Sequence, residues 1–147
     1  GTAETIHACN RGENIVIMFV NNGIYGMTGG QMAPTTLEGW KTATSPYGRD
    51  YKKEGYPIRI SEMLATLNGP AYIARTSVHN PANIIKTKKA IRKAFKAQRE
   101  GLGFSLVEVL STCPTNWGMS PVKALKRITE ETMKYYPLGE YKSVEGL

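Results

Sequence analysis

The chain has 147 residues, 41% of them apolar, and a formal net charge of +7. This length suits one domain with a buried core, here residues 1–147, and leaves little room for a second full domain. No run approaches the ~20 apolar residues that a bilayer span needs, and no secretory leader opens the chain. We therefore expect a soluble, cytoplasmic domain.

The first expected elements are a helix and an apolar strand. Residues 2–10 are predicted to form a short helix, capped by Thr2 and ended by Gly12. Residues 13–20 follow as a strand whose continuous apolar run is typical of a parallel strand buried on both faces. Residues 21–57 are rich in Gly, Pro, Thr and Tyr without sustained periodicity. A loop of that length in a compact domain is usually functional, with room here for one short helix.

Helices and strands alternate along the rest of the chain. The expected elements are a helix over 61–67 capped by Ser61, a strand over 71–78, a basic helix opened by Asn80-Pro81 and ending near Gly101, a strand over 104–110, and a last helix from Ser120-Pro121 to about Tyr135 that carries Val122, Leu125, Ile128 and Met133. This alternation predicts an α/β fold: a parallel sheet with helices on both faces.

The start of the long loop has the composition of a site for a metal-bound diphosphate. Asn21 and Asn22 follow the carboxyl end of the first strand, where ligands gather in open α/β sheets. An Asn side-chain carbonyl and a nearby backbone carbonyl are oxygen ligands that suit Mg²⁺. Glycine lets the backbone approach a ligand closely, and four follow in eight residues: Gly23, Gly26, Gly29 and Gly30. An ordinary Asn-Gly turn explains the same pattern equally well from the residues alone.

The cysteines and histidines form no recognisable metal or catalytic set. Cys9 and Cys113 lack the spacing of a metal or redox pair. Cys9 falls on the first helix and is expected to behave as a small buried hydrophobe, whereas Cys113 is a loop cysteine just past the third strand. His7 and His79 have no carboxylate or cysteine at metal-binding spacing, so structural roles are favoured for both.

The basic helix carries seven cations, as many as the net charge: Lys86, Lys88, Lys89, Arg92, Lys93, Lys96 and Arg99. Its apolar residues recur at helical spacing and predict one buried face, made of Ile84, Ile91, Ala94 and Phe95. A solvated helix surface is the simpler interpretation, and a landing surface for an acidic protein is the functional one. Nucleic-acid binding lacks support, because no aromatic residues interleave with the charges and no RNA-binding or zinc motif is present.

Three segments carry a specific resemblance. Residues 21–36, Asn-Asn-Gly-Ile-Tyr-Gly-Met-Thr-Gly-Gly-Gln-Met-Ala-Pro-Thr-Thr, resemble the β subunit of 2-oxoacid:ferredoxin oxidoreductases, where Asn-Asn closes the thiamine diphosphate motif. Residues 45–49 (Ser-Pro-Tyr-Gly-Arg) and 113–118 (Cys-Pro-Thr-Asn-Trp-Gly) are similar to stretches of the same subunits, in the same order. The motif of that family begins with Gly-Asp-Gly, which this sequence lacks. The resemblance thus implies the carboxyl-terminal part of such a subunit, with a partial thiamine diphosphate-binding fold that lacks the metal-binding aspartate.

This resemblance implies a function and its cofactors. The family oxidatively decarboxylates a 2-oxoacid to acyl-CoA and CO₂ and passes the electrons to ferredoxin, using thiamine diphosphate and Mg²⁺. Coenzyme A, the 2-oxoacid, ferredoxin, and the α and other subunits are the partners implied. The glutamate that activates the cofactor belongs to another subunit. The alternative is a catalytically inert α/β fragment that keeps only a subunit-interaction role, and the isolated chain is expected to be inactive in either case.

The resemblance also implies roles for individual residues. The side chain of Asn22 and the backbone carbonyl of Ile24 would ligate Mg²⁺. Cys113 would correspond to the fourth cysteine ligand of a 4Fe-4S cluster whose other ligands lie in the amino-terminal part of the subunit. The remaining residues of the loop would border the cofactor and the substrate approach, namely Gly26, Met27, Thr28, Gly29, Gly30 and Gln31.

Overall fold

The computed structural model describes residues 1–147, built around a four-stranded sheet with the strand order β1-β5-β4-β6. The elements in chain order are α1 (Thr2–Arg11), β1 (Val16–Asn21), β2 (Ile24–Tyr25), β3 (Gln31–Met32), α2 (Tyr51–Glu54), α3 (Ile60–Ala65), β4 (Pro70–Ser77), α4 (Pro81–Arg99), β5 (Phe104–Leu110), α5 (Pro114–Trp117), α6 (Pro121–Arg127), the π-helical turn η1 (Ile128–Thr132), α7 (Met133–Tyr135) and β6 (Gly139–Ser143). Strands β1, β5 and β4 are parallel, and β6 runs antiparallel to β4.

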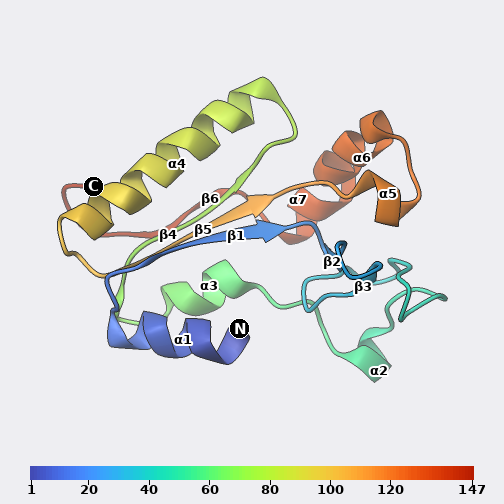
Figure 1. The fold of residues 1–147 in the computed structure, drawn as a ribbon, viewed down its shortest axis with the longest axis horizontal. Helices are drawn as coiled ribbons and strands as arrows, with labels where there is room; N and C mark the ends of the chain where they lie inside the picture. The colour runs from blue at the N-terminus through green and yellow to red at the C-terminus, as the bar shows by residue number, and fades with distance from the viewer.

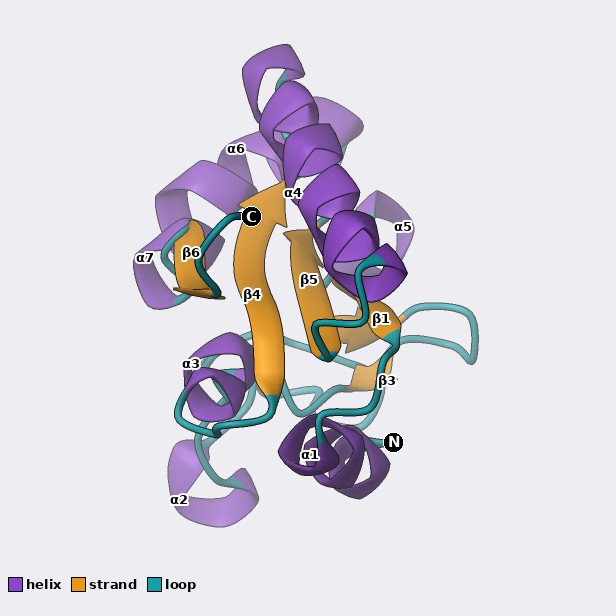
Figure 2. Ribbon diagram, turned by 90° about the vertical axis from the view of Figure 1, so that its left-hand side faces the viewer, coloured by secondary structure: helices purple, strands orange, loops and turns teal.

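Helices cover both faces of the sheet, which confirms the predicted α/β fold (Figure 1). Helix α4 lies on one face, and α1 and α3 lie on the other (Figure 2). Alternate residues of the central strand β5 serve the two layers. Phe104 and Leu106 pack in the core beside α1 and α3, and Val107 and Val109 pack in the core beneath α4. Both β4 and β5 are buried along their whole length, as is typical of strands covered on both faces in a parallel sheet.

Several predictions from local sequence signals are confirmed by the structure. The third expected strand, over 104–110, is confirmed as β5. Gly12 ends α1 in the left-handed conformation with a φ of 66°. Asn80 caps α4, because its Oδ1 accepts a hydrogen bond of 2.9 Å from the backbone N–H of Asn83. Cys9 is fully buried in the core, as expected for a cysteine on the inner face of a helix.

Two expected caps were wrong. Helix α1 begins at Thr2, so Gly1 occupies the cap position instead. Helix α3 begins at Ile60, and its cap residue Arg59 makes no side-chain cap bond. The hydroxyl of Ser61, expected to cap this helix, donates instead to a buried carboxylate on β5 at 2.6 Å.

The strand prediction erred at both edges of the sheet. The antiparallel strand β6 was not foreseen, and it makes the sheet mixed. Strand β1, expected to be buried on both faces, is an edge strand because β5 is its only neighbour in the sheet. Its Met18 and Val20 are 39% and 59% exposed, since α4 lies mainly over β4 and β5.

The buried faces of the two long helical segments also differ from the prediction. On α4, Ala94 is buried and Ile91 packs against the core as predicted, but Ile84 and Phe95 are 37% and 52% exposed. The residues that face the sheet are smaller, which lets the helix lie close to the strands: Thr87, Ala90, Ala94 and Ala97. In the last helical segment Val122 and Leu125 are exposed, and the helix is interrupted by the π-helical turn. No helix combines the length and the apolar composition needed to cross a bilayer.

Candidate functional site

The asparagine pair lies at the carboxyl end of β1, where the chain leaves the sheet. Asn21 is buried, and its side chain bonds at both ends: Nδ2 donates to Glu108 Oε1 at 2.7 Å, and Oδ1 accepts from the backbone N–H of Gly23 at 3.1 Å. Asn22 Oδ1 accepts from the backbone N–H of Ile24 at 3.2 Å. Gly23 permits this turn because its φ is +66°, in the left-handed region. The turn brings the two predicted metal ligands, Asn22 and Ile24, side by side.

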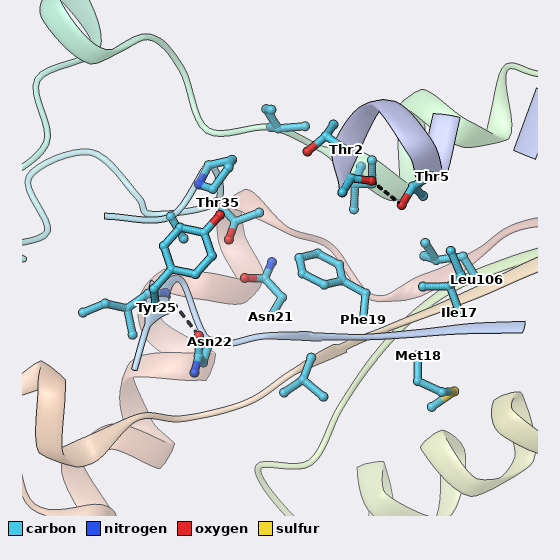
Figure 3. Close-up of a pocket in the computed structure, with 17 residues that line it drawn as sticks. Thr2, Thr5, Ile17, Met18, Phe19, Asn21, Asn22, Tyr25, Thr35 and Leu106 are labelled. Carbon is cyan, nitrogen blue, oxygen red and sulfur yellow. Dashed lines mark hydrogen bonds between the residues drawn. The ribbon is translucent and has the colours of Figure 1, made fainter. Parts of the chain in front are cut away.

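A cavity of about 330 Å³ lies next to this turn. Figure 3 shows the residues around it, with Asn22 and Tyr25 from the loop and Thr2 and Thr5 from the first turn of α1. The amino-terminal end of a helix carries a partial positive charge and free backbone N–H groups, so it favours an anion. The residues that line the cavity include no aspartate or glutamate.

This set of groups fits a metal ion bound to a diphosphate. An Asn carbonyl and a backbone carbonyl are the hard oxygen donors that Mg²⁺ takes, and the ion usually completes its shell from phosphate oxygens and water. Asn22, Ile24 and the start of α1 line one cavity, so a diphosphate bound there would meet the metal and the helix end together. The missing negative charge on the protein side would come from the diphosphate itself.

A second contact ties the loop to α5. Asn116 Nδ2 donates to the backbone carbonyl of Gly26 at 3.2 Å and contacts Cys113 Sγ at 3.3 Å. A Cβ atom at Gly26 would lie 3.1 Å from Cys113 Sγ, closer than side chains normally pack. The structure therefore brings Gly26 and Cys113 together. No group of three His, Cys, Asp or Glu side chains that could hold a metal ion occurs in the chain.

The tip of the loop stands apart from the cavity. Met27 is fully exposed, and Thr28 and Gln31 bond to each other, with Thr28 Oγ1 donating to Gln31 Oε1 at 2.5 Å. Gly29 and Gly30 turn the chain with positive φ values of 111° and 84°. None of these five residues lines the cavity, so the structure does not gather them with Asn22 and Ile24.

The rest of the long loop is held by a buried arginine. Arg49 is 5% exposed and forms no ion pair, and its guanidinium donates to backbone carbonyls. The acceptors are the carbonyls of Ala33, Pro34, Thr36, Glu54 and Gly55. A guanidinium has five N–H donors and fits such a cluster of carbonyls. Arg49 thus organises the loop, a role that its sequence pattern did not specify.

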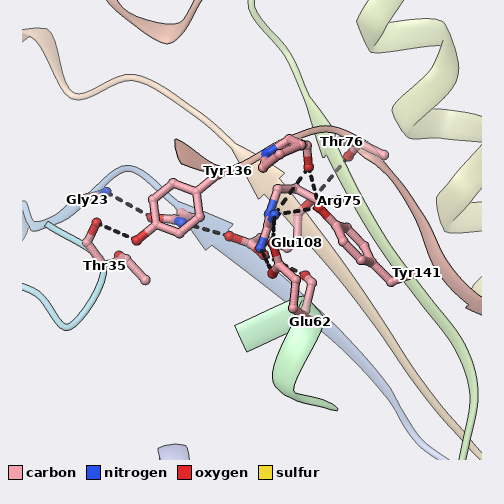
Figure 4. A network of polar contacts seen from close by, with 11 residues as sticks. Gly23, Thr35, Glu62, Arg75, Thr76, Glu108, Tyr136 and Tyr141 are labelled. Atoms are coloured by element: carbon pink, nitrogen blue, oxygen red, sulfur yellow. Dashed lines mark hydrogen bonds and ion pairs between the residues drawn. The ribbon is translucent and has the colours of Figure 1, made fainter. Parts of the chain in front are cut away.

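A buried polar network joins Asn21 to Glu108, Arg75 and Glu62. Figure 4 shows Glu108, Arg75 and Glu62 together. Arg75 on β4 is fully buried, and its guanidinium bonds Glu108 at 2.8 Å and Glu62 at 2.5 Å. Burial alone would raise the pKa of Glu62, but its hydrogen bonds with Arg75, a backbone hydrogen bond, and the charges of Arg75 and Arg59 together hold the pKa below its usual range. Sequence analysis missed this network. The available signal was the presence of Arg75 and Glu108 inside strands that are otherwise largely apolar.

The basic surface of α4 borders a second cavity, of about 450 Å³, beside β4 and β6. Lys86, Lys89 and Lys93 line it from one side of the helix. Lys93 pairs with Glu140 at 3.0 Å, while Lys86 and Lys89 form no salt bridge. Elsewhere, Trp40 of the long loop and Trp117 at the end of α5 pack edge to face, with ring centroids 5.1 Å apart.

Comparison with known proteins supplies relatives. Residues 2–109 match the family model described as thiamine pyrophosphate enzyme, C-terminal TPP binding domain. The chain is 46% identical over 142 residues to ketoisovalerate oxidoreductase subunit VorA of Methanothermobacter thermautotrophicus, an alignment covering 97% of this chain and 30% of that protein. It is 43% identical over 125 residues to 2-oxoglutarate synthase subunit KorB of Archaeoglobus fulgidus, covering 85% and 42%.

The fold also matches a solved structure. A chain of the 2-oxoglutarate:ferredoxin oxidoreductase from Magnetococcus marinus, solved with 2-oxoglutarate, coenzyme A and succinyl-CoA bound, superimposes with a TM-score of 0.71 and 22% identity. The match covers 100% of this chain and 53% of that chain. The chain thus spans less than half the length of the two curated relatives named above and about half of the solved chain.

Proposed function

Because the chain belongs to the family of thiamine pyrophosphate enzymes, as their C-terminal TPP-binding domain, and is homologous to the 2-oxoacid:ferredoxin oxidoreductase subunits VorA and KorB, we propose that it binds thiamine diphosphate and Mg²⁺ in such an enzyme. Residues 1–147 act in this proposal as one domain of the longer subunit. The parent enzyme converts a 2-oxoacid and coenzyme A to acyl-CoA and CO₂ and delivers electrons to ferredoxin.

One observation carries the proposal. The turn of Asn22 and Ile24, at the carboxyl end of a parallel strand, borders the same cavity as the first turn of α1. Asn22 Oδ1 and the Ile24 carbonyl would ligate Mg²⁺, and the free N–H groups of α1 would face the diphosphate. Thiamine diphosphate, once bound, supplies the nucleophile and the electron sink for decarboxylation, so this chain contributes placement and charge.

The other loop residues take supporting roles in this proposal. The carbonyl of Gly26, held by Asn116, fixes the chain beside the cofactor. Cys113 would serve as one ligand of a 4Fe-4S cluster completed by cysteines of the longer subunit. Residues 27–31 lie away from the cavity and would border the approach of the substrate, toward the other subunits.

The proposal is tested by cofactor binding in the complete complex. Asn22→Ala removes one oxygen ligand and should weaken the Mg²⁺-dependent affinity for thiamine diphosphate roughly tenfold or more, measured by calorimetric titration. Asn10→Ala, at an exposed position on α1, is the matched control and should bind as the parent does. Equal affinity of the parent and Asn22→Ala would contradict the assignment.

The alternative function is subunit interaction without cofactor binding. It draws on the absence of any acidic residue around the cavity and on the exposed edge strand β1 with Met18 and Val20. The isolated chain is expected to be inactive under both proposals. They separate in the complete complex, because only the first predicts that the affinity for thiamine diphosphate depends on Asn22.

A further inference from the structure

The orientation of the Asn21 amide is decided by a buried carboxylate. Glu108 is fully buried on β5, and its Oε1 faces Asn21 Nδ2 at 2.7 Å. A carboxylate can only accept hydrogen bonds, so the amide must present its nitrogen to Glu108. The amide oxygen then points the other way, where it accepts from the backbone N–H of Gly23 at 3.1 Å. A flipped amide would lose both bonds.

Glu108 is itself held in one orientation. Its second oxygen, Oε2, accepts from Arg75 Nε at 2.8 Å and from Ser61 Oγ at 2.6 Å. Three donors from three different elements therefore fix the carboxylate on both oxygens. Such a charged, fully bonded group in a buried site is rigid, because any rotation would leave a donor or acceptor unpaired.

We propose that Asn21 and Glu108 are positioning residues for the metal-binding turn. Glu108 orients Asn21, Asn21 holds the N–H of Gly23, and this bond sets the backbone that carries Asn22 and Ile24. The inference rests on the proposed function, because it concerns the same Mg²⁺ site. Outer residues that orient metal ligands typically change metal affinity by about 10- to 100-fold when they are altered.

An exchange of the two groups tests the pair. Asn21→Asp places a carboxylate against Glu108. In Glu108→Gln, the new amide NH₂ group must face another N–H donor, which is Asn21 Nδ2 in one orientation and Arg75 Nε in the other. In the double variant the new amide on β5 donates to the new carboxylate on β1, while the amide oxygen still accepts from Arg75. We therefore expect each single variant to lose about tenfold or more in Mg²⁺-dependent affinity for thiamine diphosphate, and the double variant to recover most of it.

The measurement is made on the complete complex, with thermal unfolding followed in parallel. Glu62→Gln is the control, since Glu62 bonds Arg75 but forms no hydrogen bond with Asn21 or Glu108. It should lower the melting temperature and leave the cofactor affinity unchanged. If the affinity of all four variants simply followed their melting temperatures, or if the double variant failed to recover, the positioning role would be overturned.

A failure of the positioning role can be distinguished from a failure of the proposed function. If the parent complex binds thiamine diphosphate in an Asn22-dependent manner while Asn21→Asp binds equally well, only the positioning role fails. If Asn22→Ala leaves the affinity unchanged, the metal site itself is misassigned.

Discussion

Gly30 is a position where a single methyl group should disturb the loop. Its φ is +84°, and a Cβ atom there would lie 2.9 Å from Asn116 Oδ1, on the side chain that holds the Gly26 carbonyl. Gly39 has a similar φ of +75°, but a Cβ atom there would meet no other atom within 4 Å. Both alanine variants carry the strain of positive φ, about 1–2 kcal/mol. Gly30→Ala should cost about 1 kcal/mol more in the free energy of unfolding, because Asn116 must move.

Urea unfolding of the two variants measures this difference. The comparison cancels the backbone strain, so it isolates the contact with Asn116. Equal losses for Gly30→Ala and Gly39→Ala would show that Asn116 moves freely and does not anchor the loop.

Cys9 should make the stability depend on alkaline pH. Burial raises the pKa of its thiol to about 11, above the ~8.5 of an exposed thiol. Because the folded-state pKa is the higher one, the stability from the neutral thiol is complete below about pH 8.5 and is lost as the pH rises toward 11. The free energy of unfolding should therefore fall more steeply between these pH values in the parent than in Cys9→Ala. Parallel pH profiles for the two proteins would contradict this.

At the scale of the elements, the cap of α4 is the local signal with the clearest energetic meaning. Asn80 Oδ1 accepts from the N–H of Asn83 at 2.9 Å, at the start of the longest helix. Asn80→Ala should cost about 1 kcal/mol in the free energy of unfolding, whereas Asn80→Ser, which keeps an acceptor, should cost less. Equal losses for alanine and serine would show that the cap bond contributes nothing.

Signals contained within one element were predictable from the sequence, and those that depend on a distant partner were not. The Asn80 cap, the Gly12 stop and the turn after Asn22 are set by residues within a few positions of one another. Ser61 looked like a cap because the residue type suits one, but its hydroxyl satisfies Glu108, 47 residues away. In the same way, the pattern of α4 predicted that Ala94 would face the sheet, but it did not show that Ala90 and Ala97 would do so in place of Ile84 and Phe95.

The same distinction between local and distant signals applies to the candidate site. The residues around Asn22 form a contiguous pattern, so the metal turn could be proposed from the sequence. Its support could not, because Glu108 lies 87 residues from Asn21 and Asn116 lies 90 residues from Gly26. Only the pairing of β1 with β5 in a parallel sheet brings Asn21 and Glu108 together.

At the scale of the whole molecule, charge is distributed unevenly. Helix α4 lies on the face of the sheet opposite α1 and α3, away from α2 (Figure 1), and its Lys86, Lys89 and Lys93 line the second cavity. Lys86 and Lys89 are exposed and, unlike Lys93, form no salt bridge, so their field extends into solvent. Complementary charge of this kind raises the rate of association more than the affinity. Under the proposed function, we therefore expect this face to accelerate the approach of an acidic electron acceptor, namely ferredoxin.

The expectation is tested by reversing charge at two places. Replacing Lys86 and Lys89 together by glutamate should slow association with ferredoxin about tenfold at low ionic strength, in stopped-flow measurements on the complete complex. Replacing Lys52 and Lys53 on α2 by glutamate changes the net charge equally at a distant place and should slow it far less. The difference should vanish as added salt shortens the Debye length to about 3 Å near 1 M. If the two double substitutions slowed association equally, the rate would depend only on the net charge, and α4 would be an ordinary solvated surface.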